Sequence, residues 1–232
     1  MTALAWVTFA LAVVLALVRI PSVLRGENRL MMALFALLAL AVLLSIRAPY
    51  LAIDAALGGI NLANLLLRFL IYGIALLLAV RISRAFSARG AQHALLGPWG
   101  LSALALVGAG TVVSFLLMGL LPSSVGLRAG DDQTWFDVYG ELGRVYPGFT
   151  GVVLLPSLLR AFRGSALVPL RAAAGLLAAG YIVLALTILF PLMPDGWLPV
   201  QQAMNYSSIL FLLTGLGTIW IAGGIARRRA GA

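Results

Sequence analysis

Seven long apolar stretches follow one another through almost the whole chain, separated by short polar segments. They lie near residues 2–20, 30–48, 60–81, 98–121, 135–159, 170–193 and 200–226. Each has about 20 residues or a few more, the length that an α-helix needs to cross the hydrocarbon core of a bilayer. We expect these segments to be helices and the fold to contain no sheet. The pattern predicts an all-α fold, the seven-helix bundle of a polytopic membrane protein.

The composition points the same way. Of the 232 residues, 62% are hydrophobic and only 10% are charged, whereas soluble domains carry about 25% charged residues. A water-soluble fold of this length could not bury so much apolar surface. Since the seven segments use most of the chain, we expect residues 1–232 to form a single membrane domain, with no room for a soluble catalytic domain.

Charged residues are distributed unevenly between the two ends of the predicted helices. The chain carries 16 basic and 7 acidic residues, a formal net charge of +9. One set of helix ends holds most of the arginines: Arg19, Arg25, Arg29, Arg81, Arg84, Arg89, Arg160, Arg163, Arg171, Arg227, Arg228 and Arg229. The opposite loops hold Arg47, Arg128, Asp54, Asp131, Asp132 and Asp195. Because basic residues favour the cytoplasmic side, this asymmetry predicts an outside N-terminus and a cytoplasmic C-terminus.

The clustered arginines are expected to contact anionic lipid headgroups on the cytoplasmic face. Membrane lipids are therefore the expected partners, and nucleic acid is not. Lysine is absent, and Ala, Gly, Leu and Arg dominate the composition, a bias that suits a GC-rich bacterial genome. The predicted location is the bacterial cytoplasmic (inner) membrane, crossed several times.

Several chemistries lack the residues that they need. The chain has no cysteine for a disulfide or a thiolate metal site, and no lysine for a retinal Schiff base. His93 is the only histidine, and no zinc, P-loop or dinucleotide motif is present. We therefore expect no metal, no cofactor and no enzymatic activity. Glu141 is the one residue that could serve as a general base.

One polar stripe lies within the third apolar segment. Asn61, Asn64, Arg68 and Tyr72 are spaced by three, four and four residues, which places them on one face of a helix. An arginine near the centre of a membrane helix costs about 2.5–3.5 kcal/mol on insertion scales. Such a residue is expected to face the interior of the bundle, where it binds a ligand or pairs with an acid.

Two further stripes lie in the fifth and seventh segments. Asp137, Glu141 and Arg144 share a spacing of four and three residues, and Asn205 lies between Gln201 and Ser208 on the last segment. Pro147 follows Arg144 closely and is expected to kink the helix. We expect the three stripes to line an outward-facing polar cavity in which Arg68 could pair with Glu141.

Two functions fit these stripes. In the first, the cavity binds a small polar or zwitterionic molecule for transport or sensing. In the second, the polar residues form structural ion pairs and interhelical hydrogen bonds, and the chain is a non-catalytic subunit that contacts another membrane protein. A hydrated path past Arg68 would favour the first function. Polar stripes whose side chains all pair with one another within the protein would favour the second.

The chain also contains a weak internal repeat. Pro21-Ser22-Val23-Leu24-Arg25 resembles Pro156-Ser157-Leu158-Leu159-Arg160, and with a further shift Asp54 aligns with Asp195 and Asn64 with Asn205. This suggests a 3+1+3 arrangement of helices, as in transporter folds built from parallel repeats. Chance alignment of Leu- and Ala-rich helices is the alternative.

Three short segments also carry a family resemblance. They are Arg47-Ala48-Pro49 through Asp54, Asn61 through Leu66, and Pro169-Leu170-Arg171 leading into Gly175. In these segments the chain resembles an uncharacterised actinobacterial membrane-protein family labelled as transporters. The resemblance implies a seven-span fold and an actinobacterial source, and it implies no particular activity.

Overall fold

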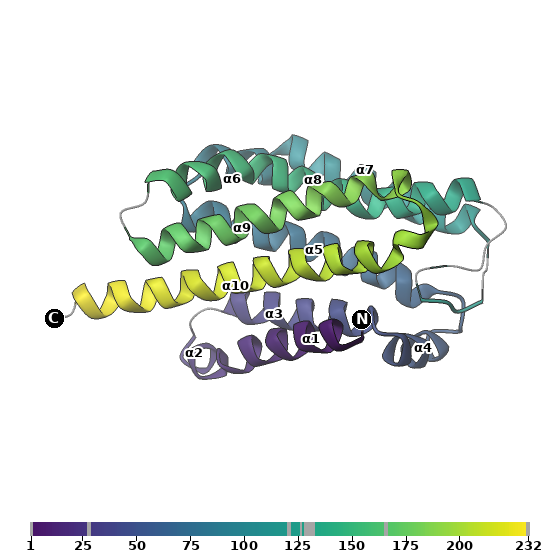
Figure 1. Cartoon of the computed structure of the whole chain (residues 1–232), viewed down its shortest axis with the longest axis horizontal. Coiled ribbons are helices and arrows are strands. Elements are labelled where there is room, and N and C mark those ends of the chain that lie inside the picture. The colour runs from purple at the N-terminus through teal and green to yellow at the C-terminus, as the bar shows by residue number, and fades with distance from the viewer. Residues whose placement is uncertain are drawn as a thin grey trace. The chain divides into compact units, whose positions relative to one another are not determined.

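The computed structural model describes residues 2–26, 29–119, 122–125, 127, 133–164 and 167–230. This part of the chain is helical and contains no strand (Figure 1), which confirms the all-α prediction. In chain order the elements are α1 (Thr2–Leu17), α2 (Ile20–Leu24), α3 (Arg29–Leu44), α4 (Arg47–Ala56), α5 (Leu62–Ala85), α6 (Arg89–Leu96), α7 (Pro98–Leu117), α8 (Gln133–Gly164), α9 (Val168–Leu186), the 3-10 turns η1 (Thr187–Leu192) and η2 (Asp195–Trp197), and α10 (Leu198–Ala230).

Six helical segments in the described part are long and apolar enough to cross a membrane. They are Ala3–Leu24, Leu62–Ala85, Pro98–Leu117, Thr134–Gly164, Val168–Phe190 and Leu198–Gly223. Each overlaps one of the predicted spans. These segments are the features of a multi-pass membrane protein.

The remaining predicted span, 30–48, corresponds to a bent pair of helices. Helix α3 has 16 residues, and at 1.5 Å per residue it extends only about 24 Å. At Ser45–Ile46 the chain turns, and α4 runs at 94° to α3. The pair is one broken span or a re-entrant segment, so the count is six or seven, and the seven-span prediction remains a prediction.

The chain divides into two compact units. The first contains Met1–Leu78 and Pro98–Pro147, and the second contains Ala79–Gly97 and Gly148–Ala232. Helices α5 and α8 each continue from one unit into the other. In α8 the boundary falls at Pro147, where the sequence predicts a kink.

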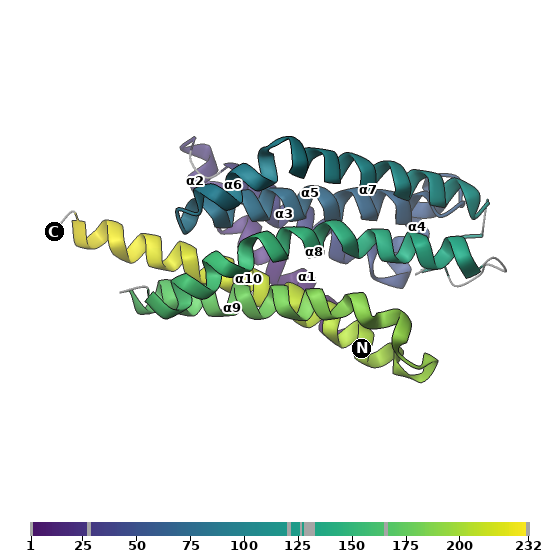
Figure 2. The same ribbon diagram turned by 90° about the horizontal axis from the view of Figure 1, so that it is seen from above.

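In the first unit, α1 lies beside α3 (Figures 1 and 2), and glycines of α7 face side chains of α5 and α8. A Cβ added at Gly110 of α7 would lie 3.3 Å from the side chain of Leu142 on α8. One added at Gly108 would lie 3.5 Å from Phe69 on α5. Gly110 therefore lets α7 approach α8 closely, as the packing rule for membrane helices predicts, and Gly108 lies in ordinary contact range of α5.

In the second unit, α9 and α10 run side by side (Figure 2). A Cβ at Gly180 of α9 would lie 3.0 Å from Leu212, and one at Gly215 of α10 would lie 2.8 Å from Leu177. The two helices thus interlock through a glycine on each side that faces a leucine on the other.

Candidate functional site

A polar seam joins three helices of the first unit. We define it as Asn64, Arg68 and Tyr72 of α5, Thr111 of α7, and Tyr139, Gly143 and Tyr146 of α8. The Tyr139 hydroxyl donates a hydrogen bond to Asn64 Oδ1 over 2.8 Å. The Tyr72 hydroxyl and Thr111 Oγ1 are hydrogen-bonded at 2.7 Å. Two members of the predicted stripe, Asn64 and Tyr72, thus bond to neighbouring helices.

Arg68 lies in the middle of the seam. Its guanidinium carbon is 4.9 Å from the centre of the Tyr139 ring, a distance at which the ring face attracts a cation. On its other side the guanidinium lies against Gly143, where an added Cβ would meet Arg68 Nη1 at 1.8 Å. A side chain at this position would displace the guanidinium, so Gly143 leaves room for Arg68 beside the Tyr139 ring.

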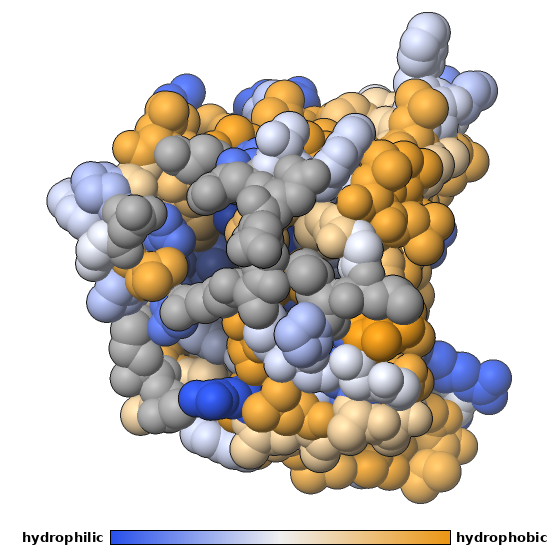
Figure 3. All heavy atoms as spheres, turned by 90° about the vertical axis from the view of Figure 1, so that its right-hand side faces the viewer, coloured by the Kyte–Doolittle hydropathy of each residue, from blue (hydrophilic) through white to orange (hydrophobic). Residues whose placement is uncertain are grey.

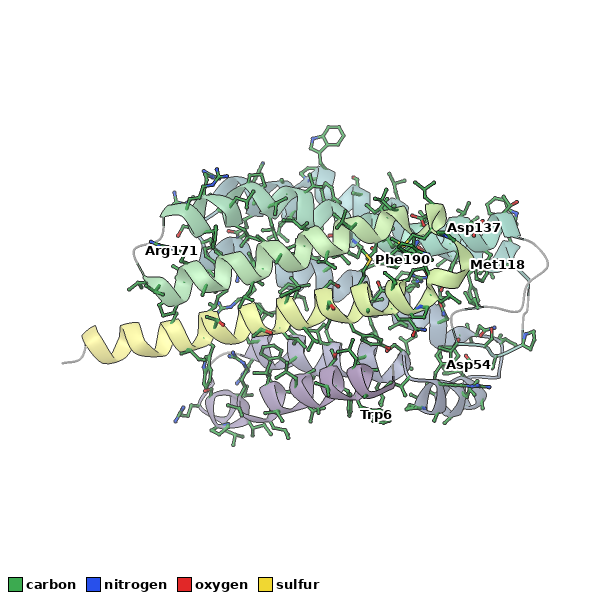
Figure 4. All side chains as sticks on the ribbon, viewed as in Figure 1. Trp6, Asp54, Met118, Asp137, Arg171 and Phe190 are labelled. Atoms are coloured by element: carbon green, nitrogen blue, oxygen red, sulfur yellow. The ribbon has the colours of Figure 1, made fainter. Side chains whose placement is uncertain are left out.

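Arg68 has no acidic partner among the described residues of the first unit. Asp54 is fully buried and accepts hydrogen bonds from other groups. Asp137 is exposed on α8, and Figure 4 shows it at the same end of this unit as Asp54 and Met118. Glu141 forms an ion pair with Arg144 of its own helix. The charge of Arg68 is thus left unbalanced by these acids.

The two polar faces of α8 explain why Glu141 does not pair with Arg68. At about 100° per residue, the stripe containing Glu141 lies roughly opposite the face of Tyr139, Gly143 and Tyr146. It is this second face that contacts α5, through Arg68 and Tyr72. The i,i+3 spacing instead brings Glu141 to Arg144, and both side chains remain partly exposed.

Asn61 belongs to a different arrangement from the rest of its predicted stripe. It precedes α5 and has a positive φ of 63°. Its backbone N–H donates to Asp54 Oδ2 over 2.9 Å, and the N–H of Ala63 donates to Asp54 Oδ1 over 2.8 Å. Asp54 therefore caps the N-terminus of α5 across the intervening turn, a favourable position for a carboxylate.

The Asn61 side chain ties the same turn to the segment after α7. Its Oδ1 accepts hydrogen bonds from the Tyr50 hydroxyl at 2.9 Å and from the backbone N–H of Ser124 at 2.8 Å. Its Nδ2 donates to the Pro122 carbonyl at 2.9 Å, and the Ser123 hydroxyl donates to Asp54. We call Tyr50, Asp54, Asn61 and Ser123 the Asp54 clamp. Its polar atoms are used within the protein, so its role is structural.

The arrangement of the Asp54 clamp and the four seam residues of α7 and α8 were missed from the sequence. For the clamp a signal existed. Asp54 is followed by the turn residues Gly58-Gly59, and Asn61 stands directly before an apolar run, a pattern typical of a helix N-terminus. For Tyr139 and Thr111 no such signal existed, because an aromatic residue or a threonine on an apolar helix face is also typical of a buried packing residue.

Asn205 lies on α10, in the second unit, with an exposed side chain. Its backbone carbonyl accepts a hydrogen bond from the Ser208 hydroxyl at 2.8 Å. That it lines a cavity together with Arg68 remains a prediction.

Metal-binding side chains do not gather in the part of the chain that the structure describes: no group of three His, Cys, Asp or Glu residues lies together there. His93 is exposed on α6. The expectations of no metal, no cofactor and no catalysis stay predictions.

Comparison with known proteins gives no further identification: no protein-family model, no curated protein and no solved structure matches the chain. The apolar helices and the polar seam define a helical, multi-pass membrane protein.

Proposed function

We propose that the protein crosses a bacterial cytoplasmic membrane seven times and binds a small polar molecule at the polar seam, for transport or sensing. The observation that carries this proposal is Arg68. It is a partly exposed cation on a membrane-length helix, and it contacts an aromatic ring and a glycine rather than a described acid. A charge at such a position is expensive and in membrane proteins marks ligand or ion pathways.

The proposed orientation has the N-terminus outside and the C-terminus in the cytoplasm. Its support is the clustering of arginines at one set of helix ends. In this arrangement α3 is the second span, α4 lies at the outer surface, and α5 begins near that surface. The seam would then open outward. The family labelled as transporters, which parts of the sequence resemble, is consistent with this arrangement.

The proposed internal repeat has one further point of support. Both α3 and α9 are followed by a short segment that carries an aspartate, Asp54 in α4 and Asp195 in η2, and then by a long helix. The Pro21 and Pro156 segments differ, however, because the first forms the separate helix α2 and the second lies inside α8.

A second function, that of a non-catalytic accessory subunit, is favoured by a different observation. The Asn64–Tyr139 and Tyr72–Thr111 hydrogen bonds and the Glu141–Arg144 ion pair show that many of the polar groups bind within the chain. In that case the seam holds helices together, and a membrane-protein partner covers an apolar face.

The two functions differ in what Arg68→Gln changes. If Arg68 binds a ligand, the purified variant should melt in detergent close to the wild type but lose the stabilisation that a ligand gives. Arg47→Gln is the matched control, since Arg47 is exposed on α4. If the variant binds every tested polar solute as the wild type does, and the wild type copurifies with a second membrane protein, the accessory function stands instead.

A further inference from the structure

The surroundings of Arg68 carry more positive than negative charge. Arg144 of α8 forms an ion pair with Glu141, so this carboxylate does not balance Arg68. Asp137 is exposed, and Asp54 is enclosed in its clamp. The described groups around the seam therefore leave one positive charge without a carboxylate.

The donors of Arg68 are also only partly used. A guanidinium has five N–H groups in a planar fork. The ring of Tyr139 covers one face of the group, and the Tyr139 oxygen lies within interacting range of it. That hydroxyl already donates to Asn64, so its oxygen can only accept from Arg68. No described carboxylate accepts from the remaining N–H groups, whose geometry suits a carboxylate or phosphate.

The seam is also rigid around this group. Asn64 holds the Tyr139 hydroxyl, the Tyr139 ring packs in a cluster with Phe115 and Met118, and Gly143 leaves room for the guanidinium. A cation held in place before the ligand arrives loses little side-chain entropy on binding. Partial burial also strengthens its attraction for an anion relative to the same contact in water.

We propose that the polar seam recognises an anionic group, a carboxylate or a phosphate, through the Arg68 guanidinium. This inference rests on the proposed binding function and narrows its ligand from a polar molecule to an anion. The same chemistry has two sources: a soluble anion, or the phosphate of an anionic lipid that reaches the seam from the membrane.

The test measures melting temperature of the purified full-length protein in detergent at constant ionic strength set with sodium chloride. The probes are inorganic phosphate, acetate, phosphatidylglycerol in mixed micelles, phosphatidylcholine in the same micelles, and the zwitterion glycine betaine. In the wild type we expect an anionic probe to raise the melting temperature by about 2–4 °C near saturation, as about 1 kcal/mol does for a chain of this size. A rise in melting temperature with phosphate or acetate indicates a soluble ligand. A rise with phosphatidylglycerol alone indicates a lipid ligand.

The variants assign the effect to Arg68. Arg68→Gln should abolish the shift, Arg68→Lys should reduce it because lysine lacks the planar fork, and Arg47→Gln should keep it. If Arg68→Gln does not fold, Gly143→Ala replaces it, because a methyl group there displaces the guanidinium while the charge is kept.

Three results would overturn the inference. A shift of the wild type with glycine betaine but with no anion, lost in Arg68→Gln, would contradict anion recognition and leave the proposed binding function standing. No shift of the wild type with any probe would contradict both the inference and the proposed function. An equal shift in the wild type and all variants would mean adsorption to the arginine-rich surface and would also overturn the inference.

Discussion

At the scale of single residues, a glycine leaves room for the central cation of the seam. Gly143 lies on the buried face of α8, and the guanidinium of Arg68 occupies the position that a Cβ would take. Gly140, one turn earlier in the same helix, has no atom within 4 Å of that position. The two glycines therefore form a matched pair.

Alanine substitution should separate the two glycines. Replacing glycine by alanine in a helix interior gains up to about 1 kcal/mol in helix propensity, and Gly140→Ala should show that gain. Gly143→Ala must push the guanidinium off the Tyr139 ring, so we expect it to be less stable than Gly140→Ala by about 1 kcal/mol. Thermal melting in detergent measures both. Equal melting temperatures of the two variants would show that the contact of Arg68 with the Tyr139 ring does not depend on Gly143.

Asp54 provides the second prediction at this scale. Its carboxylate accepts two backbone N–H groups and the Ser123 hydroxyl while fully buried. In Asp54→Asn one of those N–H donors faces an amide NH₂ group, so we expect the free energy of unfolding to fall by about 2–4 kcal/mol. Asp137→Asn removes an exposed carboxylate and should change stability by less than about 0.5 kcal/mol. Denaturation of both variants in detergent tests the comparison, and similar losses would mean that the clamp contributes little.

At the scale of elements, α4 is the helix whose role changes most between sequence and structure. The apolar run through 30–48 predicts one span, yet the chain bends by 94° between α3 and α4. Tyr50 and Asp54, four residues apart, are buried on one face of α4, while Arg47, Ala52 and Ala55 are exposed. A helix with one buried and one exposed face, at right angles to a span, is typical of the membrane interface.

The absence of cysteine from the chain makes this placement easy to test. A single Ala55→Cys substitution on α4 should react with a membrane-impermeant maleimide added to intact cells. Leu40→Cys, at a partly exposed position within α3, should remain unlabelled because lipid surrounds it. Labelling of neither position in intact cells, with labelling of Ala55→Cys after permeabilisation, would reverse the proposed orientation. Protection of both under all conditions would place α4 inside the membrane.

At the scale of the whole molecule, the division into two units falls inside α5 and α8, which both units share. In α8 the division is at Pro147, which lacks the N–H that would otherwise bond the Gly143 carbonyl. The sequence predicts a kink at this point on the same physical ground. All seam residues, from Asn64 to Tyr146, belong to the first unit.

Overall orientation gives the last prediction. In the proposed topology α6 and the C-terminus lie in the cytoplasm, so Arg89→Cys should be protected from the impermeant maleimide in intact cells and labelled after permeabilisation. Arg89 is exposed at the start of α6, so protection would not result from burial. A reporter fused after Arg229 should behave as cytoplasmic. Labelling of Arg89→Cys in intact cells would overturn the positive-inside interpretation.

The end of the first unit at which α5 begins faces the viewer in Figure 3, where hydrophilic residues lie among hydrophobic ones. The sequence predicted polar stripes within the third and fifth segments, because the 3.6-residue period of a helix is visible in the spacing of polar residues.

By itself, the sequence determined the helical class and the approximate position of each apolar segment. Both depend on local properties: the length of an apolar run, and the need of a backbone in lipid to bond within its own helix. It also determined that Asn64, Arg68 and Tyr72 share a face, because these residues lie on one helix.

Only the tertiary structure decided which groups those residues meet. Two faces of α8 obey the helical period equally well, and packing brought the face of Tyr139 and Gly143 to Arg68 rather than that of Glu141. In the same way, Ser123, 69 residues from Asp54 in sequence, completes the Asp54 clamp. Such contacts depend on how separate helices rotate and approach, which no single segment encodes.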